Sequence, residues 1–234
     1  CSGADAISTV SPSWAEYYSA LNANTVLLRN GFDNNYVDLE SETATESYLM
    51  DNEQTQPVKI SYFGSIEVEA RVPCGLLKVI AGRADLEMHF YGNCPCVEQY
   101  LINTVGEVPK NIFLNGFIPY SDSLKKMKSS DINVVSESFG DSLSHRGLIP
   151  TKIYEYLSVL NPIIVIAGKF SDMHEVCKDS GLLFYSVTEP DFDYSNILSP
   201  EYMKNYKYKP NIGEIISYSR QGVANKLAKI MDDF

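Results

Sequence analysis

The chain has 234 residues, of which 44% are hydrophobic and 21% are charged, enough for one large domain or two small ones with a well-buried core. Its formal net charge of −11, without any basic run, argues against binding nucleic acid or an anionic membrane by charge alone. We find no apolar run long enough to span a bilayer and no charged-then-apolar signal-peptide pattern.

The odd number and irregular spacing of the five cysteines argue against a disulfide framework. Cys94 and Cys96 could suggest a metal pair, but no second pair follows at zinc-like spacing. We therefore expect free thiols and a cytoplasmic protein. The first residue is Cys1 and not a methionine, so we also expect the chain to be part of a longer protein.

The first part of the chain predicts a small β-α-β unit. A β-prone run covers residues 6–10, and a helix begins at Ser11, with Pro12 just inside it. A second short strand is expected over residues 25–28. Residues 34–57 are polar and acidic, which predicts a linker or a mobile loop. We expect residues 1–50 to be the end of a missing N-terminal domain plus a linker, and residues 51–234 to be a second domain.

From residue 58 onward, strands and helices alternate. The predicted strands are residues 58–63, 86–91, 111–114, 132–136, 163–167 and 182–185. The predicted helices are residues 70–81, 97–105, 121–128, 152–160 and 172–178, followed by one C-terminal helix with Ile216, Val223, Leu227 and Ile230 on one face. This alternation predicts an α/β fold, a Rossmann-like parallel sheet with helices on both faces. Ser121 is expected to cap one helix, and Asp172 with Glu175 resembles a capping box.

Several predicted strands end close to a glycine, namely Gly64, Gly92, Gly116 and Gly140. Ligands of parallel sheets bind at the carboxyl ends of the strands. Four such glycines suggest that the backbone lies close to a ligand, although ordinary turns would also explain them.

Residues 147–167 predict a loop, a short helix and a buried strand. Ile153, Leu157 and Leu160 share one face of this helix, whereas Lys152 and Glu155 share the other, near its start. A cation, a carboxylate and free N–H groups in one place suit a phosphorylated, hydroxyl-rich ligand.

Common catalytic motifs are absent from the sequence. There is no dinucleotide-binding Gly-x-Gly-x-x-Gly after the first strand, no P-loop and no Gly-x-Ser-x-Gly elbow. The three histidines, His89, His145 and His174, cannot build a His-rich metal site.

The ordered set of strand-end loops resembles the C-terminal, donor-binding half of GT-B-fold glycosyltransferases, specifically the retaining group called family 4. The segments that carry the resemblance are Ala4-Asp5-Ala6-Ile7-Ser8-Thr9-Val10-Ser11, Arg29-Asn30-Gly31-Phe32-Asp33, Ile60-Ser61-Tyr62-Phe63-Gly64-Ser65-Ile66, Leu114-Asn115-Gly116-Phe117-Ile118-Pro119, Glu137-Ser138-Phe139-Gly140 and Glu155-Tyr156-Leu157 with Pro162-Ile163-Ile164. They cover residues 4–33 and 58–187. The resemblance implies one half of a GT-B fold.

The resemblance also implies roles for individual residues. Glu155 would accept hydrogen bonds from both ribose hydroxyls, and Lys152, with the N–H groups around Thr151, would hold the diphosphate. Glu137 would meet the sugar hydroxyls with the amides of Phe139 and Gly140. The remaining predicted contacts are the Gly64-Ser65 loop, Arg71 for the diphosphate, and the backbone near Phe117 for the base.

Two features depart from the family pattern. The Gly64-Ser65 loop lacks the usual Gly-Arg step, so Arg71 is the nearby cation. The two glutamates, Glu137 and Glu155, are eighteen positions apart where the family has eight, and residues 141–150 read as an inserted loop.

The sequence therefore predicts the donor-binding half of a glycosyltransferase that moves a sugar from a nucleoside diphosphate sugar to an acceptor hydroxyl, in glycan or polysaccharide biosynthesis. The resemblance implies retention of configuration and no bound metal or other cofactor. The acceptor, a glycan or lipid-linked sugar, and any membrane contact would belong to the missing half. The alternatives are a nucleotide-sugar 2-epimerase of the same fold and a non-catalytic binding domain.

Overall fold

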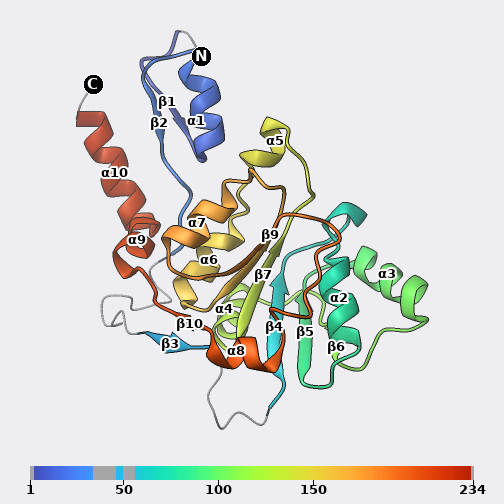
Figure 1. Cartoon of the computed structure of the whole chain (residues 1–234). Helices are drawn as coiled ribbons and strands as arrows, with labels where there is room; N and C mark the ends of the chain where they lie inside the picture. Colours follow the sequence, from blue (N-terminus) through green and yellow to red (C-terminus); the bar gives the residue numbers. More distant parts are fainter. Residues whose placement is uncertain (1–2, 34–45, 50–55, 233–234) are drawn as a thin grey trace.

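A computed structural model describes residues 3–33, 46–49 and 56–232. The strands of the central sheet are β4 (Val58–Phe63), β5 (Leu86–Tyr91), β6 (Ile112–Leu114), β7 (Ile132–Ser136), β8 (Ile163–Ile166) and β9 (Leu183–Val187). They lie in the order β6-β5-β4-β7-β8-β9, and every pair is parallel (Figure 1). The predicted α/β fold with a parallel sheet is confirmed.

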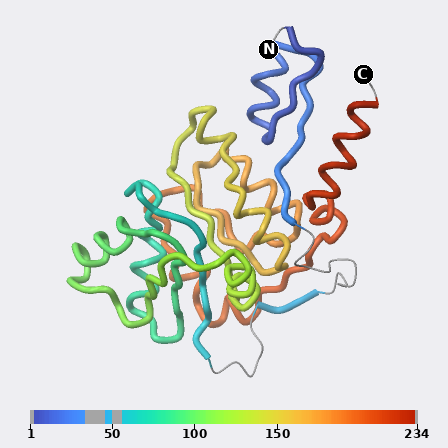
Figure 2. The backbone as a smooth tube through the Cα atoms, turned by 180° about the vertical axis from the view of Figure 1, so that it is seen from behind, coloured from blue at the N-terminus to red at the C-terminus, as the bar shows by residue number. Residues whose placement is uncertain are grey.

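Helices cover both faces of this sheet, because alternate residues of each strand point to opposite sides. One core contains Ile60 and Met88 under α2 (Cys74–Ala81) and α3 (Pro95–Val105). The other contains Phe63 and Val165 under α4 (Tyr120–Lys128), α6 (Lys152–Val159) and α7 (Met173–Asp179) (Figure 2).

The chain order reverses between the neighbouring strands β4 and β7, which makes their carboxyl ends the switch point where such sheets bind ligands. The β4–β7 pairing runs from Ile60↔Ile132 to Tyr62↔Val134. Beyond it, the hydroxyl of Tyr156 accepts a hydrogen bond from Phe63 N at 3.0 Å and donates one to Val134 O at 3.1 Å. A side chain of α6 thus fills the gap where the two strands part.

The first part of the chain forms a separate β-α-β unit, as predicted. Strands β1 (Ile7–Thr9) and β2 (Thr25–Leu27) pair in parallel, and α1 (Pro12–Ser19) packs against both. In Figure 1 this unit lies at one end of the molecule, above α7 and beside α5 (Leu143–Arg146). The assignment of residues 1–50 to another domain stays a prediction, and residues 34–45 and 50–55 of the expected linker lie outside the described residues.

The predicted capping box at the start of α7 is wrong. Asp172 makes no side-chain capping bond there, and its carboxylate instead accepts two hydrogen bonds from Ser13 in the first turn of α1, one from N and one from Oγ, both at 2.9 Å. Asp172 therefore caps α1 from a distant part of the chain, joining the β-α-β unit to the main domain.

Other differences have local causes. The helix expected from residue 70 begins at Cys74, because Pro73 holds the preceding Val72 extended, and a 3-10 turn, Glu69–Arg71, comes before it. Ser121 is not a cap, since the helix already begins at Tyr120 after Pro119. The inserted loop contains α5.

The single C-terminal helix is two helices, α9 (Ile212–Ser217) and α10 (Arg220–Asp232). The break occurs because this backbone pairs with Phe32, whose N donates to Tyr218 O and whose O accepts from Arg220 N. Sequence patterns also missed α8 (Pro200–Asn205) and the short antiparallel pair β3 (Ser47–Tyr48) and β10 (Lys207–Tyr208).

Candidate functional site

Three glycine loops meet at the carboxyl ends of β4, β5 and β6. Gly64 N donates to Tyr91 O at 2.9 Å, and Gly92 N donates to Gly116 O at 2.8 Å. Gly92 has φ +142°, and a Cβ added to it would lie 2.1 Å from Gly64 O. Only glycine fits so close an approach of two backbones. The structure thus brings Gly64, Gly92 and Gly116 together as the sequence suggested.

A cavity of about 270 Å³ opens beside these loops. Its lining includes three residues of the predicted site, Gly64, Phe117 and Lys152, together with Tyr91 and Tyr120. Phe117 is 79% exposed, which leaves it open to a ligand. The volume is close to the lower end of small-molecule sites, roughly 300–1,000 Å³.

Helix α6 brings Lys152 to this cavity, and its opposite face is buried; Glu155 does not line the cavity. Ile153 and Leu157 are fully buried. Lys152 Nζ lies 2.6 Å from Glu155 Oε2 and 5.5 Å from the centroid of the Tyr120 ring. The Glu155 side chain is only 15% exposed, so its carboxylate is a partly desolvated acceptor held by one cation. The prediction that Lys152 and Glu155 share one face of the helix is confirmed, and the structure shows in addition that they form an ion pair.

The first turn of α6 leaves backbone donors for a ligand. Ile153 N donates to Pro150 O and Tyr154 N to Thr151 O, both at 3.1 Å. Across the described residues, the N–H groups of Thr151 and Lys152 have no such bond. Thr151 is exposed at the N-cap and makes no side-chain capping bond. These are the N–H groups that the sequence assigned to a diphosphate.

A second group of predicted residues lies at the end of β7. Arg71 Nε is 2.8 Å from Glu137 Oε2, and Ser136 Oγ donates to Arg71 O at 2.8 Å. Glu137 Oε2 is buried and accepts no hydrogen bond from the described residues. Burial raises the pKa of Glu137, and the neighbouring Arg71 charge partly opposes that rise.

The remaining predicted residues lie around this group. Ser65 O accepts a hydrogen bond from the Tyr62 hydroxyl at 3.4 Å. The Phe139 ring is partly buried against the core of the sheet, so only its backbone is positioned as predicted. Gly140 is tightly packed, since a Cβ on Gly168 would lie 2.7 Å from Gly140 O. None of Ser65, Arg71, Glu137, Phe139 and Gly140 lines the cavity at Gly64. Their part in a binding site stays a prediction.

Sequence reasoning missed Tyr120 and Tyr91 as lining residues. Tyr120 is the first residue of α4 and follows directly after the Phe117-Ile118-Pro119 loop. Its closeness to that predicted loop is the sequence feature that could have identified it as a lining residue. Tyr91 is the last residue of β5 and stacks on Phe63 at a centroid distance of 4.7 Å.

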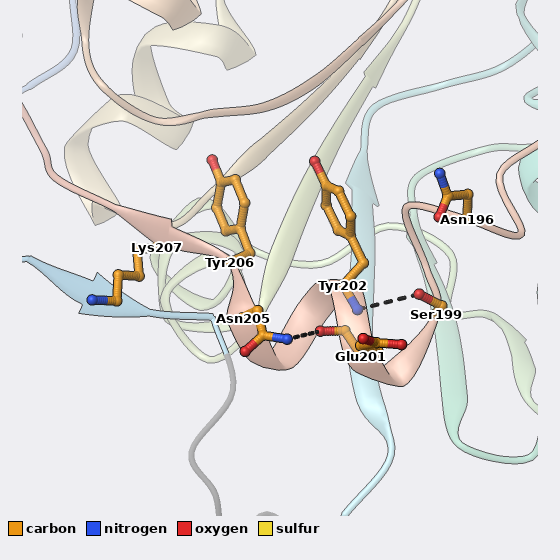
Figure 3. Close-up of a pocket in the computed structure, with 7 residues that line it drawn as sticks. All are labelled: Asn196, Ser199, Glu201, Tyr202, Asn205, Tyr206 and Lys207. Carbon is orange, nitrogen blue, oxygen red and sulfur yellow. Dashed lines mark hydrogen bonds between the residues drawn. The ribbon is translucent and has the colours of Figure 1, made fainter.

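A larger cavity, of about 550 Å³, is formed by α8 and β10 (Figure 3). It lies near the amino ends of the strands, because Leu198, just before α8, bonds to Arg83, just before β5. Its cation, Lys207, is 3.2 Å from Glu46. We favour the smaller cavity as the functional site because the strand-end glycines Gly64 and Gly92 line it together with Lys152, at the start of α6.

Within the described residues, no three His, Cys, Asp or Glu side chains gather as metal ligands. A search of the same residues finds no helix with the length and apolar character that crossing a membrane requires.

No protein-family model and no curated protein sequence matches the chain. Solved structures do match. The chain aligns with HepE from Anabaena, in complex with UDP and glucose, at a TM-score of 0.67 and 12% identity, over 99% of this chain and 64% of that one. With the apo lipopolysaccharide outer core galactosyltransferase WaaB the TM-score is 0.66 at 14% identity, over 98% and 62% of the two chains. With sucrose-phosphate synthase from Thermosynechococcus elongatus it is 0.62 at 12% identity, over 99% and 59%.

The chain has the fold of the C-terminal half of GT-B glycosyltransferases. It spans 59% to 64% of the length of these three proteins. The fold expected from the sequence resemblance is therefore confirmed, including its Rossmann-like sheet. The roles of the individual site residues stay predictions.

Proposed function

We propose that this chain is the donor-binding half of a glycosyltransferase that uses a nucleoside diphosphate sugar. The observation that carries the proposal is the cavity at Gly64 and Gly92, because Lys152 lines it and is paired with Glu155 at the start of α6. A strand-end glycine loop, helix-start N–H groups, a cation and a carboxylate together match a diphosphate linked to a ribose.

In this proposal each charged residue has a separate task. Lys152, with the N–H groups of Thr151 and Lys152, holds the diphosphate, and Glu155 accepts hydrogen bonds from the ribose hydroxyls. The base lies beside Phe117. Ligand binding then replaces part of the Lys152–Glu155 contact, which in the free chain keeps both charges paired at 2.6 Å.

The donor sugar lies toward Glu137 and Gly140. The acceptor hydroxyl forms a bond to the anomeric carbon while the bond from that carbon to the phosphate oxygen breaks. The nucleoside diphosphate leaves with the bonding electrons, and its departing phosphate oxygen accepts the proton of the acceptor hydroxyl. Lys152 and Arg71 stabilise the charge that grows on the diphosphate.

We further propose that the anomeric configuration is retained, that no metal or cofactor is needed, and that the pathway is cytoplasmic glycan or polysaccharide biosynthesis. Another part of the same protein would then bind a glycan or lipid-linked acceptor and provide any membrane contact.

Thermal shift with UDP, GDP and ADP tests the binding step. UDP is the first choice because the HepE structure contains it. A nucleotide present at a hundred times its Kd stabilises the folded chain by about 2.7 kcal/mol. For a chain of this size, this corresponds to an increase in Tm of about 5–11 °C. Glu155→Ala should weaken binding about tenfold to a hundredfold, the value of hydrogen bonds to a charged acceptor. The matched control is Glu98→Ala, an exposed carboxylate in the first turn of α3.

No shift with any of the three nucleotides, or unchanged nucleotide binding by Glu155→Ala, would argue for a non-catalytic domain and against the proposal. Product analysis with a nucleotide sugar, with and without acceptor, separates transfer from 2-epimerisation. We expect the chain to bind nucleotide and to show little turnover by itself. Robust sugar transfer by these 234 residues would contradict the proposal that the acceptor binds to another part of the protein.

A further inference from the structure

Helix α5 lies between the two glutamates of the candidate site, in the segment that the sequence marked as inserted. Its His145 ring packs directly on Gly140, since a Cβ added to Gly140 would lie 2.8 Å from the ring. Ser142 Oγ lies 2.5 Å from His145 Nδ1 and fixes the orientation of the ring. His145 itself is exposed. Within the described part of the chain, its Nε2 makes no hydrogen bond, so the imidazole presents one polar atom to solvent beside the Gly140 loop.

The position of α5 is set by the N-terminal β-α-β unit. A Cβ added to Gly147, directly after α5, would lie 2.3 Å from Trp14 Cδ1. Arg146 O accepts a hydrogen bond from Asp172 N at 2.9 Å. The Asp172 carboxylate in turn binds Ser13. The indole of Trp14 in α1 therefore covers the end of α5. Helix α1 is also bound through Ser13 to Asp172, whose N–H donates to the last residue of α5.

Resting on the proposed function, we propose that α5 forms a wall of the donor-sugar subsite, where His145 hydrogen-bonds a hydroxyl of the sugar and Trp14 is the positioning residue that fixes α5. The loop from Glu137 to Gly140 is the part of the site assigned to the sugar, and the His145 ring lies on its last residue. An imidazole nitrogen either donates to or accepts from a hydroxyl, so it suits an uncharged sugar. This contact with the sugar would come from the inserted segment, residues 141–150, which the family pattern lacks.

Titrations of UDP and of UDP-glucose, UDP-galactose and UDP-N-acetylglucosamine test the proposal. The wild-type chain should bind at least one of the UDP-sugars more tightly than UDP. His145→Ala should leave the affinity for UDP within about twofold and weaken that UDP-sugar about fivefold to tenfold, the value of one hydrogen bond. Because His145 is exposed, this variant should fold normally.

Two further variants test the positioning role of the Trp14 contact. Gly147→Ala forces a methyl group into the indole and should reduce the preference for the UDP-sugar in the same way. Gly82→Ala is the control, because the nearest atom to its Cβ is 3.9 Å away and it lies outside the site. It should leave both affinities unchanged.

The fluorescence of Trp14, which is the only tryptophan in the sequence, gives an independent readout. The preferred UDP-sugar should change its emission and UDP should not, and the change should disappear in His145→Ala. If wild-type protein binds UDP and every UDP-sugar equally, or if His145→Ala weakens both ligands alike or neither, the inference is wrong while the proposed function stands. Failure of all nucleotides to bind would instead refute the proposed function, and the inference with it.

Discussion

The Tyr156 hydroxyl is the group that most directly links the fold to the site. It bridges Phe63 N and Val134 O at the point where β4 and β7 stop pairing. The residue is 1% exposed, and burial holds the pKa of its phenol well above the usual range. The hydroxyl therefore stays protonated and serves both strands. Gly64, the first glycine of the candidate site, follows Phe63 directly.

Tyr156→Phe removes both hydrogen bonds and leaves a buried N–H and a buried C=O without this partner. At about 1–2 kcal/mol for each group, we expect a loss of about 2–4 kcal/mol in the free energy of unfolding. For a chain of this length that corresponds to a decrease in Tm of about 4–16 °C.

Urea unfolding and thermal melts measure the effect, with Tyr194→Phe as the matched control. Tyr194 is 2% exposed, but its hydroxyl makes no hydrogen bond to the described residues. The control should change stability by less than about 1 kcal/mol. Equal losses in the two variants would show that the Tyr156 bridge does not hold the sheet together at the switch point, and would refute this reasoning.

Three further changes have expected outcomes. Asp172→Ala removes both bonds to Ser13 and should destabilise the chain by about 1–3 kcal/mol, with faster proteolysis within residues 3–33; unchanged proteolysis would contradict the docking role. Burial raises the pKa of Glu137, so this carboxyl contributes stability at low pH that is lost as the pH rises through the shifted pKa. Glu137→Gln should therefore gain stability relative to wild type between pH 4 and pH 7 in denaturation curves, and a gain for wild type over that range would reverse the sign of our argument. Gly92→Ala places a methyl group against Gly64 O at positive φ and should lower stability by about 2–4 kcal/mol, measured by urea unfolding; a neutral effect would mean that the two loops separate freely.

The sequence predicted the central sheet well because parallel strands buried on both faces give short apolar runs with clear ends. Residues 58–63, 86–91 and 132–136 match β4, β5 and β7 at both ends. Boundaries failed where tertiary contacts decide them. The break before α10 depends on the pairing of Phe32 with Tyr218 and Arg220, and no local pattern around residue 218 encodes that partner.

The candidate site was predictable where residues are close in sequence. The spacing of Lys152 and Glu155 predicted that they share one helix face, and in the structure Lys152 Nζ lies 2.6 Å from Glu155 Oε2. Contacts between distant segments were not predictable from composition or periodicity. Arg71 pairs with Glu137 across the end of the sheet, and Asp172 caps α1 from 159 residues away. Both depend on how the fold brings separate loops together.

The central claim is that a nucleoside diphosphate binds at the glycine loops and the start of α6. Amide chemical-shift mapping during a titration with UDP, GDP or ADP tests it most directly, because it reports where the ligand lies as well as whether it binds. We predict that the largest shifts occur at Gly64, Gly92 and Lys152. The largest shifts at Tyr202 and Tyr206, in the cavity of α8 and β10, would contradict the account.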